Sequence, residues 1–199
     1  MGDPVFPYPG GKTGMADDIM RSFPEHRAYV EVFGGAAGVL FSKKQSPVEI
    51  YNDKDSSIVH FFRILRDHCG ELKEWLDSVP YSRELYEEWV EDFYSDNYPD
   101  DDIERAGRFF FLRYSQFAGI YSREVGFSTA INSASPAISF SNKVERLTEF
   151  SDRLSRVIIE DMDAFELVEK YDSENTLFYC DPPYIDVENK KYRYHSFGH

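Results

Sequence analysis

The chain has 199 residues, of which 42% are hydrophobic and 17% aromatic, so it is long enough to bury one sizeable core. No apolar run approaches the roughly 18 residues of a membrane helix, and the N-terminal MGDPVFPYPGG lacks the basic and apolar regions of a signal peptide. Its two cysteines, Cys69 and Cys180, lack the spacing of a disulfide framework or a zinc site. We therefore expect a cytoplasmic globular protein with no membrane partner and no bound metal.

The formal net charge of −14 is unevenly distributed along the chain. Residues 105–156 carry eight Lys or Arg against four Asp or Glu, or +4, which leaves −18 for the remainder. Nonspecific affinity for DNA comes largely from neutralised phosphates. If the protein binds a polyanion, the middle of the chain is therefore the region expected to face it.

The first third of the chain predicts a βαβ unit. Residues 16–22 have a helical pattern, and the apolar run AYVEVF at 28–33 ends in glycines. The following GVLFSKK continues as a helix, and VEIYND at 48–53 predicts a second strand that ends in an acid.

Helical spacing dominates the middle of the chain. Residues 56–94 predict two packing helices, and the acidic stretch 95–104 predicts a solvated loop. The arginine- and aromatic-rich RAGRFFFLRYSQFAGIY and the polar residues up to 142 are expected to form a loop region inserted between helices. An amphipathic basic helix is predicted for 143–156.

The last third predicts two further strands and the most informative motif. The strand VIIE and a helix around AFELVEKY precede TLFYC, a strand that leads directly into Asp181-Pro182-Pro183-Tyr184. Methylation of an exocyclic amino nitrogen requires its lone pair to point at the methyl group. The Asp181 carboxylate and the Pro182 carbonyl can each accept one amino N–H, while the prolines hold the carbonyl rigidly and Tyr184 can stack on an extruded base. A simple Pro-Pro turn at the end of a strand is the alternative interpretation.

A small-residue turn, Phe33-Gly34-Gly35-Ala36-Ala37-Gly38, separates the first strand from its helix. Such a turn lets a ligand approach the backbone and the helix N-terminus, but it is compatible with any nucleotide-binding sheet. Asp53, at the end of the second strand, can accept hydrogen bonds from both ribose hydroxyls of an adenosine. A helix N-cap is the alternative role for Asp53.

The chain resembles Dam-type DNA adenine-N6 methyltransferases, in which PYPGGK, YVEVFGG, VEIYND, FFFLRYSQFAG and FYCDPPY occur in this order. The resemblance implies S-adenosylmethionine as cofactor and adenine in double-stranded DNA as substrate. By that resemblance the cofactor-binding residues are Tyr8, Lys12, Phe33, Gly34, Gly35, Asp53, Asp163 and Asp181. The catalytic motif is Asp181, Pro182, Pro183 and Tyr184, and the residues expected to contact DNA are Arg113, Tyr114, Phe117, Tyr121 and Arg123.

Four positions depart from the family pattern. Ala37 stands where the family usually has a second glycine, which would crowd the cofactor, and Ala164 separates Asp163 from the aromatic Phe165 that normally follows it directly. Ala118 replaces a small polar residue near DNA. The chain also stops at His199, where the family continues into further strands, so we expect an incomplete sheet with an exposed edge that a second polypeptide could complete.

We therefore predict a Rossmann-like α/β methyltransferase sheet, incomplete at its C-terminus, with a helical and loop insertion for target recognition. Residues 1–62 and 150–199 would form the catalytic domain, and residues 63–149 the insertion. Three alternatives stay open: a cytosine-N4 or RNA-base methyltransferase, a noncatalytic remnant that binds cofactor or DNA, and a nucleotide-dependent oxidoreductase. The aspartate at position 181 argues against cytosine, for which a serine would be expected.

Overall fold

The structure is a computed structural model and describes residues 4–117, 125–129 and 135–182. A four-stranded sheet lies at its centre, with the strands β1 (Ala28–Glu31), β2 (Val48–Asn52), β3 (Val157–Glu160) and β4 (Thr176–Tyr179). The strand order is β3-β2-β1-β4 and every pairing is parallel. The four predicted strands and the Rossmann-like α/β fold are confirmed.

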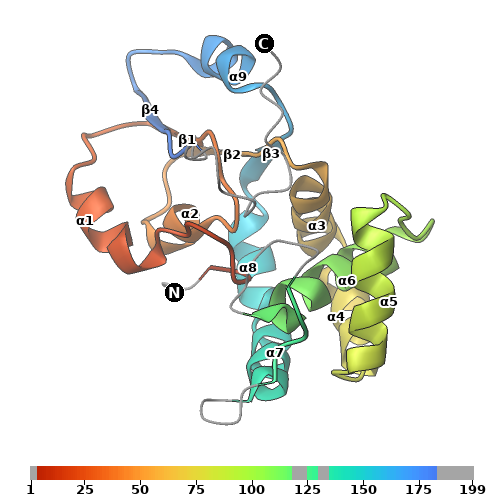
Figure 1. Ribbon diagram of the computed structural model, residues 1–199. Helices are drawn as coiled ribbons and strands as arrows, with labels where there is room; N and C mark the ends of the chain where they lie inside the picture. The colour runs from red at the N-terminus through yellow and green to blue at the C-terminus, as the bar shows by residue number, and fades with distance from the viewer. Residues whose placement is uncertain (1–3, 118–124, 130–134, 183–199) are drawn as a thin grey trace.

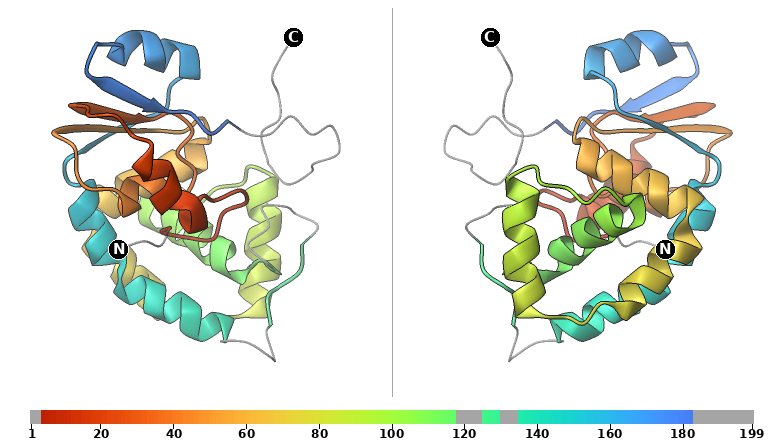
Figure 2. Two further views of the ribbon diagram at one scale, coloured as in Figure 1. Left: turned by 90° about the vertical axis from the view of Figure 1, so that its left-hand side faces the viewer. Right: turned by 90° about the vertical axis from the view of Figure 1, so that its right-hand side faces the viewer.

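Helices cover the two faces of the sheet unequally (Figures 1 and 2). On one face, α9 (Ala164–Tyr171) buries Leu167 against Val30, Val32 and Ile50. The other face carries η1 (Thr13–Met15), α1 (Ala16–Arg21), α2 (Gly38–Ser42), α3 (Ser56–Asp67) and α8 (Leu147–Leu154). This second face holds the larger core, which continues into the helices beyond it.

The segment between β2 and α6 contains three helices where the sequence predicted two. Besides α3 they are α4 (Cys69–Ser78) and α5 (Arg83–Tyr94). The break falls at His68, whose φ of −135° and ψ of 36° are not helical. A continuous apolar spacing hid this break, because both helices bury the same kind of stripe against α6.

Two further boundaries differ from the prediction. The acidic loop ends earlier than expected, because Asp101 caps α6 (Asp102–Ser115) by accepting a hydrogen bond from the Glu104 N–H at 2.8 Å. The loop expected for RAGRFFFLRYS is therefore wrong, because these residues form most of α6. Helix α7 (Pro136–Glu145) begins inside the region predicted as a polar loop, with its proline at the first position. A turn at Arg146 then separates α7 from α8, so the single helix predicted for 143–156 is wrong.

The N-terminal segment packs against α3, α6 and α7. Val5 and Phe6 have no exposed surface, and the Phe6 ring meets Phe61 edge to face at 5.5 Å between centroids. The Tyr114 hydroxyl donates to the Val5 carbonyl at 3.2 Å, and Lys143 Nζ donates to the Pro4 carbonyl at 3.0 Å. These contacts place the following residues, 8–12, beside the sheet.

Within the part of the chain that the structure describes, no helix combines the length and apolarity needed to cross a membrane.

Candidate cofactor and catalytic site

The predicted site residues gather at one edge of the sheet. Because the four strands are parallel, their carboxyl ends lie together, and each is followed by a predicted site residue. The glycine turn follows β1, Asp53 follows β2, Asp163 follows β3 and Asp181 follows β4. Strand order reverses between β1 and β4, and this is the position at which open α/β sheets form their ligand crevice.

Close packing explains both glycines of the turn. A Cβ on Gly34 would lie 2.1 Å from Cε2 of Tyr51, and one on Gly35 would lie 2.9 Å from Cδ1 of Tyr8. Gly35 also has a φ of +49°, in the left-handed region that favours glycine. The Tyr51 hydroxyl donates to the Gly35 carbonyl at 2.7 Å, so the ring that excludes a side chain also holds the turn.

Ala37 adopts a left-handed conformation just before α2. Its φ is +57° and its methyl group is fully buried. The geometry therefore accounts for the family's usual glycine at this position, since an alanine there has a strained backbone. The predicted crowding of the cofactor by this methyl group stays a prediction.

Asp53 links the glycine turn to the end of β2. One carboxylate oxygen accepts from the Gly35 N–H at 2.7 Å, and the other accepts from the Asp55 N–H at 2.8 Å. Burial raises the pKa of Asp53 to about 6, and those two backbone hydrogen bonds oppose the rise. The alternative role as an N-cap belongs instead to Asp55, which caps α3 by accepting from the Ser57 N–H at 2.9 Å.

Asn52 is a site residue that the sequence interpretation missed. Its side-chain amide donates to the carbonyls of Val32 at 2.9 Å and Met162 at 3.2 Å, and its side-chain oxygen accepts from the Met162 N–H at 2.8 Å. The buried amide thus joins the chain after β1 to the chain after β3. Its place beside Asp53 in VEIYND was the only signal available.

Lys12 and Asp181 form an ion pair of 2.7 Å across the site, and both side chains are mostly buried. Lys12 Nζ also donates to the Gly10 carbonyl at 3.0 Å. The pair brings the N-terminal motif into direct contact with the predicted catalytic motif, which sequence spacing did not indicate. Pro182 is exposed next to Asp181, whereas Pro183 and Tyr184 lie outside the described residues.

The remaining predicted cofactor residues line the same edge. Phe33 is half-buried and packs against the small cluster beneath α9. Asp163 is exposed and caps α9, with one oxygen accepting from the Phe165 N–H at 2.8 Å. The Phe165 side chain is 87% exposed and so remains accessible at this edge.

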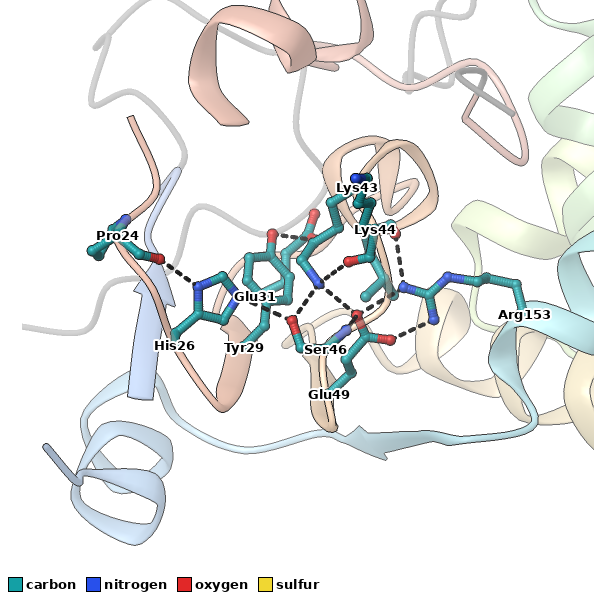
Figure 3. A network of polar contacts seen from close by, with 10 residues as sticks. Pro24, His26, Tyr29, Glu31, Lys43, Lys44, Ser46, Glu49 and Arg153 are labelled. Carbon is teal, nitrogen blue, oxygen red and sulfur yellow. Dashed lines mark hydrogen bonds and ion pairs between the residues drawn. The ribbon is translucent and has the colours of Figure 1, made fainter. Parts of the chain in front are cut away.

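A buried charge network joins β1, the end of α2, β2 and α8 (Figure 3). Glu49 of β2 is held between Lys43, at 2.5 Å, and Arg153 of α8. Burial alone would raise the pKa of Glu49, but hydrogen bonds from Arg153 and Lys43 hold it below its ordinary value. Glu31, at the end of β1, accepts from the Tyr29 hydroxyl at 2.9 Å, and burial raises its pKa to about 8.

The predicted DNA-contacting residues have different surroundings. Arg113 is 1% exposed and lies over the rings of Phe93 and Phe109, so it is not on the surface where a phosphate could reach it. Tyr114 is half-buried against the N-terminal segment, and Phe117 is 61% exposed. Tyr121 and Arg123 lie outside the described residues.

Most described basic side chains of residues 105–156 have intramolecular contacts. Arg108 pairs with both Asp92 and Glu104, at 3.0 and 2.6 Å, and the other contacts involve aromatic rings, acids or a backbone carbonyl. These other side chains are Arg105, Arg113, Lys143, Arg146 and Arg153. The local charge of +4 therefore does not correspond to a free basic surface in the described part of this region.

Together these features define a class of protein. A parallel sheet, a glycine turn after β1, an acid after β2 and a polar motif at the switch point are typical of Rossmann-like enzymes that bind an adenosine-containing cofactor.

Comparison with known families identifies the group within that class. Residues 8–199 match the D12 class N6 adenine-specific DNA methyltransferases. Because the match covers nearly the whole chain, the protein belongs to this family.

Several named relatives are similar over most of the chain. A DNA adenine methylase of Vibrio cholerae is 25% identical over 186 residues, which cover 90% of this chain and 64% of the relative. The type II methyltransferase M.MjaIII of Methanocaldococcus jannaschii is 24% identical, covering 91% of this chain and 68% of its own length. M.CviBI of a Paramecium bursaria Chlorella virus is 24% identical, with 98% and 74% covered.

Proposed function

We propose that this chain transfers a methyl group from S-adenosylmethionine to N6 of adenine in double-stranded DNA. The observation that carries the proposal is the meeting of the glycine turn, Asp53 and Asp181 at one sheet edge in a member of the D12 family. The chain spans 64% of the length of the Vibrio relative, so its activity and the roles of its residues are proposals.

The residues at the edge fit an adenosine-containing cofactor. Asp53 uses each oxygen for one backbone hydrogen bond, and a carboxylate with about four acceptor sites can still accept from ribose hydroxyls. Asp163 uses one oxygen for its cap and can accept an adenine amino hydrogen with the other. Gly34 and Gly35 allow the Tyr51 and Tyr8 rings to pack directly on the turn, and this packing holds the turn at the edge where the cofactor is proposed to bind.

For the reaction, the cofactor would supply a methyl group on a sulfonium: the S–C bond breaks as the N–C bond forms, the neutral thioether S-adenosylhomocysteine leaves, and the methylated nitrogen releases one proton to solvent. Asp181 accepts one N–H of the target amine and the Pro182 carbonyl accepts the other, so the nitrogen lone pair is directed at the methyl group. Lys12, paired with Asp181 at 2.7 Å, keeps this carboxylate at a fixed position. Pro183 and Tyr184 are proposed to complete the motif, with Tyr184 stacking on the extruded base.

The direct test is product analysis. The chain is incubated with isotopically labelled S-adenosylmethionine and unmethylated duplex DNA, the DNA is digested to nucleosides, and the labelled nucleoside is identified by mass spectrometry. We expect labelled N6-methyladenine. Labelled N4-methylcytosine would contradict the adenine assignment, and cofactor binding without any product would favour a noncatalytic remnant.

Substitutions at Asp181 and Asp53 separate catalysis from cofactor binding. We expect Asp181→Ala to abolish methyl transfer while leaving cofactor affinity within a few-fold, because Asp181 contacts the amine. We expect Asp53→Ala to weaken cofactor affinity by roughly tenfold to a hundredfold, since hydrogen bonds to a charged acceptor contribute about 1.5–3 kcal/mol. Unchanged turnover in the first variant, or unchanged affinity in the second, would remove that residue from its role.

The pH dependence of cofactor binding provides a check specific to Asp53. Because its pKa is about 6, the carboxylate becomes protonated as pH falls through that value. Only the ionised form has both oxygens available as acceptors for the ribose hydroxyls. We expect cofactor affinity to decline below about pH 6 in the natural chain. Asp53→Asn should bind weakly at every pH and lack this inflection.

A further inference from the structure

Tyr81, Arg83 and Tyr86, in and just before α5, contact a short antiparallel pairing between the end of α6 and residues 126–128. Residues 115–117, at the end of α6, run antiparallel to residues 126–128, with Gln116 opposite Phe127. The Phe117 N–H donates to the Gly126 carbonyl at 3.0 Å, and the Ser128 N–H donates to the Ser115 carbonyl at 2.7 Å. This pairing fixes the backbone from which the exposed Phe117 side chain projects.

Two tyrosine hydroxyls attach the pairing to α5 and to the connection that precedes it. The Tyr81 hydroxyl lies 3.3 Å from both the Tyr114 and the Ser128 carbonyl oxygens, so it shares one hydrogen between the two paired segments. The Tyr86 hydroxyl, on α5, donates a short hydrogen bond to the Val125 carbonyl. One tyrosine thus holds the two segments together, and the other holds the returning segment against the helix.

The Phe127 ring fills the space between these tyrosines. Its centroid lies 5.0 Å from the Tyr81 ring and 5.6 Å from the Tyr86 ring. The guanidinium carbon of Arg83 lies 5.1 Å from the same centroid. We call Tyr81, Arg83, Tyr86 and Phe127 the aromatic clasp.

The location of the clasp suggests what it positions. In both views of Figure 2, β4 ends toward the side of the molecule on which α5 lies, so α5 and the catalytic edge of the sheet share one side. Among the described residues, the hydroxyls of Tyr81 and Tyr86 donate to backbone carbonyls of the segments next to Phe117. Loss of a clasp hydroxyl would therefore loosen this surface without altering the cofactor site.

We propose that Tyr81 and Tyr86 are positioning residues for DNA binding, which fix the direction in which Phe117 and its paired backbone meet the duplex. This inference rests on the proposed DNA methyltransferase function. It predicts that removing either hydroxyl weakens duplex affinity and leaves cofactor affinity unchanged.

The experiment compares Tyr81→Phe and Tyr86→Phe with Tyr98→Phe as a matched control. The Tyr98 hydroxyl also makes a hydrogen bond, to Asp96 at 3.0 Å, but it lies outside the clasp. Duplex affinity is measured by fluorescence anisotropy with a labelled pool of random-sequence duplexes. Cofactor affinity is measured by titration calorimetry with S-adenosylmethionine, at a temperature where circular dichroism shows all four proteins folded.

We expect each clasp variant to raise the duplex Kd by about fivefold, as the loss of one neutral hydrogen bond implies, with the cofactor Kd within twofold. The control should bind both ligands like the natural chain. Clasp variants that bind duplex normally, or that lose cofactor affinity in proportion, would overturn the positioning role. Failure of the natural chain itself to bind duplex would instead overturn the proposed function on which the inference rests.

Discussion

Two buried glutamates on neighbouring strands should respond to the same substitution with opposite signs. Glu31 is 2% exposed, it accepts a hydrogen bond from the neutral Tyr29 hydroxyl, and burial raises its pKa from 4.5 to about 8. Glu49 is equally buried but lies between Lys43 and Arg153, whose hydrogen bonds hold its pKa below the ordinary value despite burial. Replacing each by glutamine removes the charge and keeps the shape.

The sign for Glu31 follows from its raised pKa. The folded chain binds a proton that the unfolded chain has released, so this contribution to stability is complete below pH 4.5 and is lost as pH rises through about 8. Each pH unit of difference between the two pKa values corresponds to about 1.4 kcal/mol. The free energy of unfolding of Glu31→Gln, relative to that of the natural chain, should therefore rise by about 2 kcal/mol as the pH increases from 5 to 7.

Glu49→Gln should behave in the opposite way. It leaves two buried cations without their shared carboxylate, which costs about 3–5 kcal/mol at neutral pH. Because the pKa of Glu49 is depressed, the stability that it contributes is present at neutral pH and is lost as pH falls through its folded pKa. The difference between this variant and the natural chain should therefore shrink in acid.

Urea unfolding followed by circular dichroism at pH 5, 6, 7 and 8 measures both differences. The informative quantity is how the difference in unfolding free energy between each variant and the natural chain changes with pH. A difference that stays constant with pH reports only the replacement of the acid by an amide. Parallel curves for the natural chain and Glu31→Gln would refute the claim that Glu31 is protonated in the folded protein at neutral pH.

Three further predictions follow from the turn and from the charge distribution. Ala37→Gly should be about 1 kcal/mol more stable than Ala36→Gly in urea unfolding, because both lose a buried methyl and only the first relieves a φ of +57°; equal stabilities would show that the alanine is unstrained. Gly34→Ala should destabilise by about 1–3 kcal/mol through its clash with Tyr51, whereas Gly14→Ala, which meets nothing within 4 Å, should leave the urea midpoint nearly unchanged; similar midpoints for the two would rule out that clash. Raising salt from 50 to 200 mM should weaken duplex binding by less than the roughly 10³-fold expected for six phosphate contacts, since the middle basic residues contact the protein itself; a steeper loss in anisotropy titrations would mean that other cations bind DNA.

Local patterns predicted the parallel sheet and its order of elements well. Each strand lies within a short apolar run, and such runs are clearest in the central strands β1 and β2, which are mostly buried. The helix α9 was predicted with its observed bounds, because Asp163 marks its start and the apolar spacing ends at Tyr171. The breaks at His68 and Arg146 were missed because the apolar stripe continues across both, although Gly70 lies two residues after the first break.

The candidate site was predictable where a residue type has one clear use. The glycines and Asp53 follow strands whose ends must meet at one edge, so their convergence followed from the parallel sheet. The pairing of Lys12 with Asp181 was not predictable, because it joins residues far apart in the chain. The role of Asn52 was missed because the position of an asparagine after a strand does not show which backbone groups its amide contacts. The burial of Arg113 was also missed, because an arginine among aromatics has the same pattern on a surface and in a core.

The burial of residues 4–6 has a consequence for how the protein folds. Lys143 contacts the Pro4 carbonyl across 139 positions of sequence, and Tyr114 contacts Val5 across 109. Contacts between such distant positions form late and slow the search for the native state. At synthesis rates of about 5–20 residues per second, Phe6 would wait on the order of ten seconds for α7 to leave the ribosome. Residues 4–6 thus wait longer for these partners than apolar residues whose contacts lie nearby in the sequence, which makes them a natural site for chaperone binding to the nascent chain.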